Sequence, residues 1–424
     1  MNLRGEMVLR AGWLIHKDFR ARASAFGAGG ADKLERLNLL LRRARAALPE
    51  YDVACAAALE GAAGLSSPGQ FSVLPVMRRE NLAGYAGGSA LARLASGGTA
   101  GGDRFETRLD LSAVAARYAA LLSVLKAAGW KMGDRTAALH PVEYSYFANL
   151  PAMLAGGQFG KVFFEFFQQY VLYRLVHNRV NVYYGGSIFS EPGAALALAE
   201  EAAAREPVLL ITRPDALMAV LKSLRGGAGP RFKKLKAVLT VGTLLGESVR
   251  REARERLGAE VFNMYASTEL GYAALSCPHS EGWLHADGAG HIVEAGADGE
   301  ILCTDLDNAL APLLRYGTGD LGETASRGCL CGRAGEMLRL NGRKGKYAET
   351  ATGRLYEAGV IDRVFPSDLP FFQLVPGSVL LPAGAGEKEA AAVRELLGVK
   401  AADYGAAAPG SFKISSSGKF CYLP

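Results

Sequence analysis

The chain has 424 residues, half of them apolar, which is more than one hydrophobic core usually holds, so we expect a soluble globular protein of two or more domains. The net charge of +6 comes from 48 basic and 42 acidic residues that are mixed along the chain, which argues against nucleic acid as a partner. The N-terminus has no apolar signal core, and six cysteines do not make a disulfide scaffold in a chain this long. We therefore expect a cytoplasmic protein without a membrane segment.

Helices are expected over residues 1–70, where leucines recur among arginines and an alanine-rich segment follows. Strands and helices then alternate, with strand patterns at residues 207–212, 237–241 and 261–262 and helix patterns at 215–224 and 247–257. This βαβαβ order predicts a parallel sheet with ligand sites at the carboxyl ends of its strands. Both Gly242 and Tyr265 fall at such ends.

The last third of the chain changes character. Residues 299–321 read as short strands and turns, and residues 342–346 have the glycine and charge content of a hinge. The predicted fold class is α/β, with a large N-terminal domain of parallel sheets and a β-rich subdomain, followed by a small α+β C-terminal domain. We place these domains at residues 1–343, including a helical leader over about residues 1–70, and at residues 344–424.

A glycine-rich loop lies upstream of the alternating region. Its backbone N–H groups can approach phosphate oxygens, and the loop adds two hydroxyls and a nearby positive charge. It is not a Walker loop, because no Gly-Lys-Ser/Thr follows. The residues expected to contact phosphate are Ser96, Gly97, Gly98, Thr99, Gly101 and Arg104.

A second motif, Tyr-Ala-Ser-Thr-Glu, ends the third strand pattern. Tyr265, Thr268 and Glu269 bring an aromatic ring, a hydroxyl and a carboxylate to one strand end, where a nucleotide and its Mg²⁺ could be held together. Asp320 follows in Arg-Tyr-Gly-Thr-Gly-Asp, Arg343 in Gly-Arg, and Lys419 in Ser-Gly-Lys near the end of the chain. Several loose signals in one fixed order are more specific than any of them alone.

This ordered set resembles the adenylate-forming superfamily of acyl-activating enzymes, and in particular the phenylacetate-CoA ligase branch and its capsule-biosynthesis-type relatives. The resemblance covers roughly residues 70–343, and Lys419 beyond them. It implies ATP and Mg²⁺ as cofactors. It also implies that Tyr265 flanks adenine, that Thr268 bonds the α-phosphate, and that Glu269 holds Mg²⁺.

The same resemblance implies roles for residues outside that motif. Asp320 would accept the ribose hydroxyls, and Arg343 would reach the ribose or a phosphate. Gly242 would place backbone against the acyl group and adenine. Lys419 would bridge the substrate carboxylate and the α-phosphate, and it would leave when the C-terminal domain rotates about the hinge.

Two tight pairs of ligand-type residues predict a structural zinc site. Cys277 and His279 form one pair, and Cys329 and Cys331 form the other, so the set offers three thiolates and an imidazole. Similar pairs occur in proteins that resemble phenylacetate-CoA ligase. His285 and His291 flank the region and are spare candidates.

The substrate and the acyl acceptor are less defined by the sequence. An aromatic or other apolar acid is favoured, because an aromatic-rich segment could wall its pocket. The rings in question are Phe147, Phe163, Phe164, Phe166, Phe167, Tyr170, Tyr183 and Tyr184. CoA is the first choice of acceptor, with a carrier-protein thiol or an amine as alternatives, and a homodimer is allowed.

A reading of another class is a degenerate relative that binds nucleotide as a scaffold. The presence of Glu269, Asp320 and Lys419 argues against it, because a scaffold needs none of them. A zinc-dependent hydrolase is disfavoured because the sequence has no His-Glu-x-x-His helix or open His-rich site. The sequence therefore predicts an AMP-forming ligase.

Overall fold

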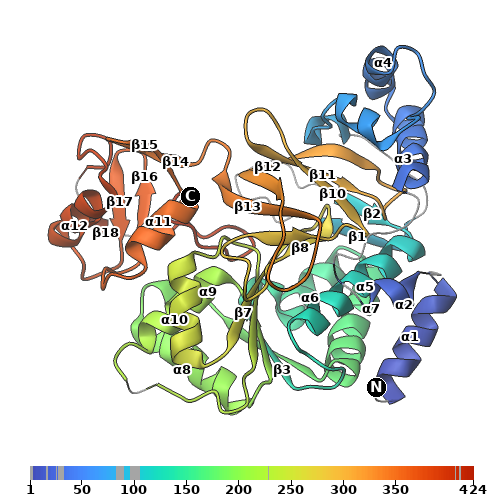
Figure 1. The fold of residues 1–424 in the computed structure, drawn as a ribbon. Helices are drawn as coiled ribbons and strands as arrows, with labels where there is room; N and C mark the ends of the chain where they lie inside the picture. Colours follow the sequence, from blue (N-terminus) through green and yellow to red (C-terminus); the bar gives the residue numbers. More distant parts are fainter. Residues whose placement is uncertain are drawn as a thin grey trace. The chain divides into compact units, whose positions relative to one another are not determined.

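The computed structural model describes residues 3–15, 18–24, 26, 33–82, 90–95, 106–227, 229–405, 407–409 and 412–424. These residues form two compact units, each drawn from separate stretches of the chain (Figure 1). The first unit takes the described residues of 1–96 and 103–127 together with 264–340. The second takes the described residues of 128–263 and 341–424. Within the described part of the chain, no helix is long and apolar enough to cross a membrane.

The first unit is built on antiparallel strands. The end of β7 (Glu260–Ser267) pairs with β8, β8 with β9, β9 with β13, and β10 with β11, which pairs with β12. Leucines of α3 lie in one core with the inner faces of these strands. Its elements are α1 (Leu3–Ile15), α2 (Phe19–Arg22), α3 (Lys33–Ala47), α4 (Pro49–Ala58), β1 (Ala92–Ala95), β2 (Glu106–Leu109), α5 (Leu111–Ala127), β8 (Gly271–Leu275), β9 (Leu284–Ala286), β10 (His291–Ala295), β11 (Glu300–Asp305), β12 (Leu313–Ser326) and most of β13 (Glu336–Arg343).

The second unit is built on parallel strands. β3 lies between β4 and β5, and β5 pairs with β6, all in parallel register. β7 (Glu260–Ser267) follows β6 in the strand order and continues into the first unit, so the hydrogen-bonded order β10-β11-β12-β13-β9-β8-β7-β6-β5-β3-β4 is one mixed sheet of 11 strands. The other elements of the first half are β3 (Thr136–Pro141), α6 (Tyr146–Ala155), α7 (Phe159–Phe166), a π-helix (Phe167–Val176), β4 (Arg179–Tyr184), α8 (Pro192–Ala204), β5 (Leu209–Thr212), α9 (Pro214–Ser223), β6 (Ala237–Val241) and α10 (Glu247–Leu257).

Residues 341–424 complete the second unit. They share one hydrophobic core with the apolar residues of β3 to β6, α8 and α9. Their elements are β14 (Tyr347–Thr350), β15 (Gly353–Tyr356), α11 (Glu357–Val364), β16 (Gln373–Val375), β17 (Ser378–Leu381), α12 (Glu387–Leu397) and β18 (Ala407–Pro409). β14 and β15 form a hairpin, and β16, β17 and β18 form a small sheet.

The predicted α/β fold class and its central βαβαβ order are confirmed. β6 and α10 have the predicted bounds. α10 ends where expected because Gly258 takes a left-handed conformation, with φ +62°, directly after a last turn that carries Arg254 and Arg256. β7 is longer than predicted, because its second half gains a partner in β8 that the local pattern does not reveal.

The chain terminus is held on Glu357, the first residue of α11. The Glu357 carboxylate accepts the backbone N–H of Tyr422 at 2.7 Å and of Leu423 at 2.9 Å. Burial raises the pKa of Glu357 to about 7, although these two N–H groups act in the opposite direction. The last residues of the chain are therefore tied to a carboxyl group that titrates near neutral pH.

Glu357→Gln should change how stability depends on pH. The folded pKa of about 7 lies above the reference value of 4.5, so the folded state binds more protons than the unfolded state between these values. The wild type therefore loses stability from this group as pH rises through that window, and glutamine does not. Urea unfolding at several pH values from about 5 to about 8 should show the difference in unfolding free energy moving steadily in favour of the variant.

The exposed Glu395→Gln provides the matched control, and its curve should stay parallel to the wild type. A Glu357→Gln difference that stays constant with pH would contradict the assignment.

Candidate functional site

The first unit brings together two predicted nucleotide-binding residues from β7 and β12. The hydroxyl of Tyr265 donates to Oδ2 of Asp320 at 2.7 Å, although the residues are 55 positions apart. Burial and then the charge of Asp320 raise the pKa of Tyr265, so the phenol keeps its proton. Tyr265 therefore fixes the direction of the carboxylate that was predicted to accept ribose hydroxyls.

Thr268 and Glu269 lie in the turn between β7 and β8, and Arg117 of α5 donates hydrogen bonds to the backbone of this turn. Nη1 of Arg117 donates to the carbonyl oxygen of Thr268 at 2.9 Å, and Nη2 donates to that of Glu269 at 2.5 Å. Nη2 also lies 3.3 Å from Oδ2 of Asp305, whose side chain is 1% exposed. A buried ion pair thus fixes two consecutive carbonyl groups.

His291 holds the next carbonyl group of the same turn. Its Nε2 lies 2.8 Å from the carbonyl oxygen of Leu270, and its Nδ1 lies 3.7 Å from Oδ2 of Asp287. Burial disfavours the charged ring, but the neighbouring carboxylates led by Asp287 outweigh it and raise the pKa of His291. With its backbone held in this way, the carboxylate of Glu269 makes no hydrogen bond or ion pair with the described residues.

In the second unit, Lys419 lies at the carboxyl end of β6. Its Cε would be 3.9 Å from a Cβ atom placed on Gly242, the residue that follows the strand. Gly242 has φ +101°, a conformation that side-chain-bearing residues rarely adopt. The sequence placed both residues in one site, and the structure puts them side by side.

Positive groups gather around Lys419. Burial, followed by the charge of Arg213 and more weakly that of Arg343, lowers the pKa of Lys419. Asp215 acts in the opposite direction, but it is ion-paired with Arg213. A bound anion would offset the cost that burial and these guanidinium groups impose on the charged lysine.

The predicted nucleotide-site residues fall into two groups. Tyr265, Thr268, Glu269 and Asp320 lie in the first unit, and Gly242, Arg343 and Lys419 lie in the second. The predicted glycine-loop residues lie outside the described part of the chain and stay a prediction; they are Ser96, Gly97, Gly98, Thr99, Gly101 and Arg104.

A group of metal-ligand residues also lies in the first unit. The ligand atoms of Cys277, His285, Cys329 and Cys331 all lie within 4.8 Å of one another, and no other such group occurs among the described residues. Sγ of Cys277 is 3.5 Å from Sγ of Cys329, and Sγ of Cys331 is 3.4 Å from Nε2 of His285. Burial lowers the pKa of His285 to about 4, so the imidazole is neutral at neutral pH.

The histidine of this group differs from the predicted one. His285 takes the place of His279, which contacts the group through its backbone: its carbonyl oxygen lies 3.8 Å from Sγ of Cys329, and its backbone also bonds to Cys277. His285 enters because β9 pairs antiparallel with β8, and Leu275, two residues before Cys277, lies opposite His285. Spacing along the chain favoured the nearer histidine, whereas strand pairing brings in the farther one.

The aromatic residues proposed to wall an acid pocket are mostly at the surface. Phe147, Phe163 and Phe167 are exposed, whereas Tyr184 is buried at the end of β4. The Tyr184 hydroxyl has no hydrogen-bond partner among the described residues, and its ring centroid lies 5.9 Å from the guanidinium carbon of Arg213. Of the rings described, Tyr184 is the one that the structure places beside the Lys419 site.

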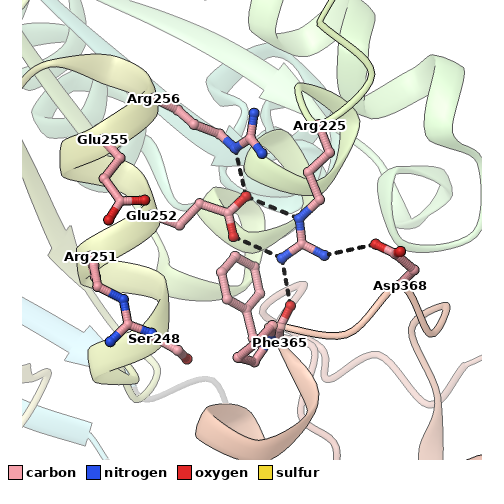
Figure 2. Close-up of a pocket in the computed structure, with 9 residues that line it drawn as sticks. Arg225, Ser248, Arg251, Glu252, Glu255, Arg256, Phe365 and Asp368 are labelled. Carbon is pink, nitrogen blue, oxygen red and sulfur yellow. Dashed lines mark hydrogen bonds and ion pairs between the residues drawn. The ribbon is translucent and has the colours of Figure 1, made fainter.

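A separate cavity of about 340 Å³ lies between α9, α10 and the segment after α11. Figure 2 shows Arg225 pointing into it between Glu252 and Asp368, with its side chain also bonded to the carbonyl oxygen of Phe365 at 2.6 Å. Three arginines and three acids line this space, so its charges balance and it does not indicate an ionic ligand. The cavity shares no lining residue with the Lys419 site.

No model of a known protein family matches the sequence, and no curated protein matches it. Solved structures do match it. 2-Hydroxyisobutyryl-CoA ligase, in the postadenylation state with 2-HIB-AMP, aligns with a TM-score of 0.64 at 16% identity over 93% of this chain and 90% of that one. The same ligase with 2-HIB-AMP and CoA in the thioesterification state gives 0.56 at 16% over 88% and 86%.

O-Succinylbenzoate coenzyme A synthetase from Bacillus subtilis, in complex with AMP, gives a TM-score of 0.50 at 14% identity over 79% of this chain and 68% of that one. The chain therefore has the fold of adenylate-forming acyl-CoA ligases, as the sequence resemblance predicted.

Sequence reasoning missed several residues of the site. Arg213 and Asp215 directly follow β5, so the rule that ligand sites lie at strand ends could have found them. Arg117 gave no local signal, because its partners lie 151 residues away or more. His291 was considered only as a metal ligand.

Arg117→Met should cost about 3 kcal/mol of unfolding free energy, because it leaves the buried Asp305 and two carbonyl groups without their partner. Chemical denaturation would measure this loss. The control is Arg254→Met, which removes an exposed ion pair with Glu260 and should change stability by about 0.5 kcal/mol or less. Equal losses in the two variants would contradict the role of Arg117.

Proposed function

We propose that this protein is an ATP- and Mg²⁺-dependent ligase that converts a small carboxylic acid to an acyl-adenylate and then transfers the acyl group to CoA. The observation that carries the proposal is the placement of the half-buried Lys419 against Gly242 and beside Arg213, in a chain with the fold of acyl-CoA ligases. An anion-binding edge with a lysine at its centre fits phosphoryl chemistry.

In the first half-reaction, a carboxylate oxygen of the acid attacks the α-phosphorus of ATP, and the bond from that phosphorus to pyrophosphate breaks. Negative charge shifts onto the leaving pyrophosphate and the α-phosphoryl oxygens, so fixed cations lower the barrier. Lys419 would bridge the carboxylate and the α-phosphate, and Arg343 would contact the ribose or a phosphate.

Residues of the first unit would bind the rest of the nucleotide. Tyr265 would flank adenine while directing Asp320 toward the ribose hydroxyls, and Thr268 would donate to the α-phosphate. The carboxylate of Glu269 fits a Mg²⁺ ligand, because the described residues leave it unpaired and Arg117 fixes its backbone. The bound ion would supply charge neutralisation at the phosphates. The glycine loop at residues 96–104 would wrap the phosphates.

In the second half-reaction, the thiol sulfur of CoA attacks the acyl carbon and AMP leaves. Lys419 would first have to withdraw, and a rotation of residues 344–424 about the segment 342–346 would achieve this. Gly345, with φ +78°, provides backbone freedom there. An apolar or aromatic acid remains our favoured substrate, and an amine or a carrier-protein thiol would be the acceptor if CoA is not.

The test is pyrophosphate release from ATP across a panel of aryl, aliphatic and amino acids, with and without CoA. Release with at least one acid, and thioester formation when CoA is added, would support the proposal. Binding of ATP without release for every acid would instead favour a nucleotide-binding scaffold.

Lys419→Ala should lose most of the adenylation rate, about 10²-fold or more, while the affinity for ATP changes little, because the lysine acts on charge that forms in the transition state. Pyrophosphate exchange and equilibrium nucleotide binding would separate these effects. Lys413→Ala is a matched control, since Lys413 is an exposed lysine of the same segment. Unchanged exchange in Lys419→Ala would refute the assigned role.

We also propose that Cys277, His285, Cys329 and Cys331 hold one structural Zn²⁺. Three sulfurs and one imidazole are the donor set of closed tetrahedral zinc sites. A Zn–S bond of about 2.3 Å with tetrahedral angles separates two sulfurs by roughly 3.8 Å. The observed sulfur–sulfur and sulfur–nitrogen distances of 3.5 and 3.4 Å fit that geometry with small adjustments.

Elemental analysis of protein purified without added zinc should therefore give about one zinc per chain. His285→Ala should lose most of it and lower the melting temperature, whereas His279→Ala should retain it. Retention in His285→Ala with loss in His279→Ala would restore the ligand set predicted from sequence. Absence of zinc from a stable wild type would end the proposal.

A further inference from the structure

Arg213 and Asp215, at the start of α9, hold the backbone on both sides of Lys419. Nη1 of Arg213 donates to the carbonyl oxygen of Ser417 at 2.9 Å, and Nη2 donates to that of Gly418. Oδ2 of Asp215 accepts the backbone N–H of Phe420 at 2.9 Å. The two side chains therefore contact the residues immediately before and after the lysine.

The two side chains are also paired with each other. Nε of Arg213 lies 3.0 Å from Oδ1 of Asp215, and Nη2 lies 2.5 Å from Oδ2. The Arg213 side chain is 8% exposed and that of Asp215 is 1% exposed. Burying such a pair costs desolvation energy and adds little net stability. Fold stability alone is therefore a weak reason for this pair to contact the loop of residues 415–420, which we call the C-terminal loop.

The loop leaves little freedom for the backbone of Lys419. The N–H of Lys419 donates to Oγ of Ser415 at 3.0 Å, and Gly418 has φ +70°. A Cβ atom on Gly418 would lie 2.4 Å from Cβ of Pro141, so the loop packs directly against the end of β3. The ring of Phe420 stacks on that of Phe189, with centroids 4.8 Å apart.

We propose that Arg213 and Asp215 are positioning residues that fix the direction of Lys419 for the first half-reaction. The inference rests on the proposed function. It adds that the ion pair acts through the backbone of residues 417–420 and serves only the step in which Lys419 is engaged. A guanidinium is required because one planar group must reach two carbonyl oxygens and a carboxylate together.

The test uses Asp215→Asn, which keeps the size of the side chain and one acceptor oxygen but removes the charge that holds Arg213. Adenylation should slow about 30-fold with little change in the KM for ATP, because a small displacement of a catalytic group is costly. Thioester formation from a chemically prepared acyl-adenylate should change less than about twofold. In a Lys419→Ala background, Asp215→Asn should have almost no further effect on adenylation.

Full additivity with Lys419→Ala, or equal loss in both half-reactions, would overturn the proposal. Arg213→Lys is a second variant that keeps the charge but cannot reach both carbonyl oxygens and the carboxylate together, and it should give a loss comparable to that of Asp215→Asn. It therefore keeps the test open if Asp215→Asn does not fold. Arg254→Gln, which breaks an exposed pair with Glu260, should behave as wild type.

Hydrogen exchange separates this inference from the proposed function. Amides of residues 418–421 should exchange faster in Asp215→Asn or Arg213→Lys than in wild type, while exchange in β5 and β6 stays unchanged. If these amides exchange faster but the protein adenylates no acid, the result would support the restraint of residues 417–420 by Arg213 and Asp215 and would reject the proposed ligase function. Unchanged exchange in these variants would reject that restraint, whether or not the protein is an active ligase.

Discussion

The candidate site in the second unit depends on one geometric constraint, which is that parallel strands end at the same edge of a sheet. β3 and β5 are parallel neighbours, as are β5 and β6, so the residues that follow them lie close together without being close in sequence. Arg213 follows β5 and Gly242 follows β6, and residues 415–420 need to meet only this edge to bring Lys419 beside both. The ring of Phe420 packs against Phe189 and holds the loop on the protein, and the hydrogen bond from its backbone N–H to Asp215 orients the loop backbone.

Each unit holds a loop of the proposed site with the same arrangement of charges. Arg117 is paired with Asp305 and donates to two consecutive carbonyl groups, and Arg213 is paired with Asp215 and does the same. The planar guanidinium offers several donors at fixed angles, so one side chain can restrain a whole turn while its partner carboxylate keeps it in place. An apolar residue would be cheaper to bury but would leave those carbonyl groups without donors. The arrangement therefore fixes the backbone of each loop at some cost in stability.

The sequence predicted what local patterns control and missed what distant partners decide. β6 and α10 were predicted with the right bounds because a short apolar run, a first-turn acid and a terminal glycine all act within a few residues. β7 was predicted too short because the pairing of its second half with β8 is a tertiary matter. The three cysteines of the cluster were predicted together from their spacing, whereas His285 lies beside them in place of His279 through the register of β8 and β9. Tyr265 and Asp320 were predicted to share a site by resemblance, but the hydrogen bond between them was not.

The charge around Lys419 links loop seating to ligand binding. Arg213 and Arg343 both disfavour the charged form of Lys419, as does burial, and the nearby Asp215 is already paired with Arg213. Seating the loop thus places a charged lysine where burial and two guanidinium groups disfavour its charge, and a bound anion would offset that cost. Once the anion leaves or loses charge, the same repulsion favours departure of the lysine. The seating and the departure of Lys419 would then be governed by one electrostatic balance at the edge of the sheet.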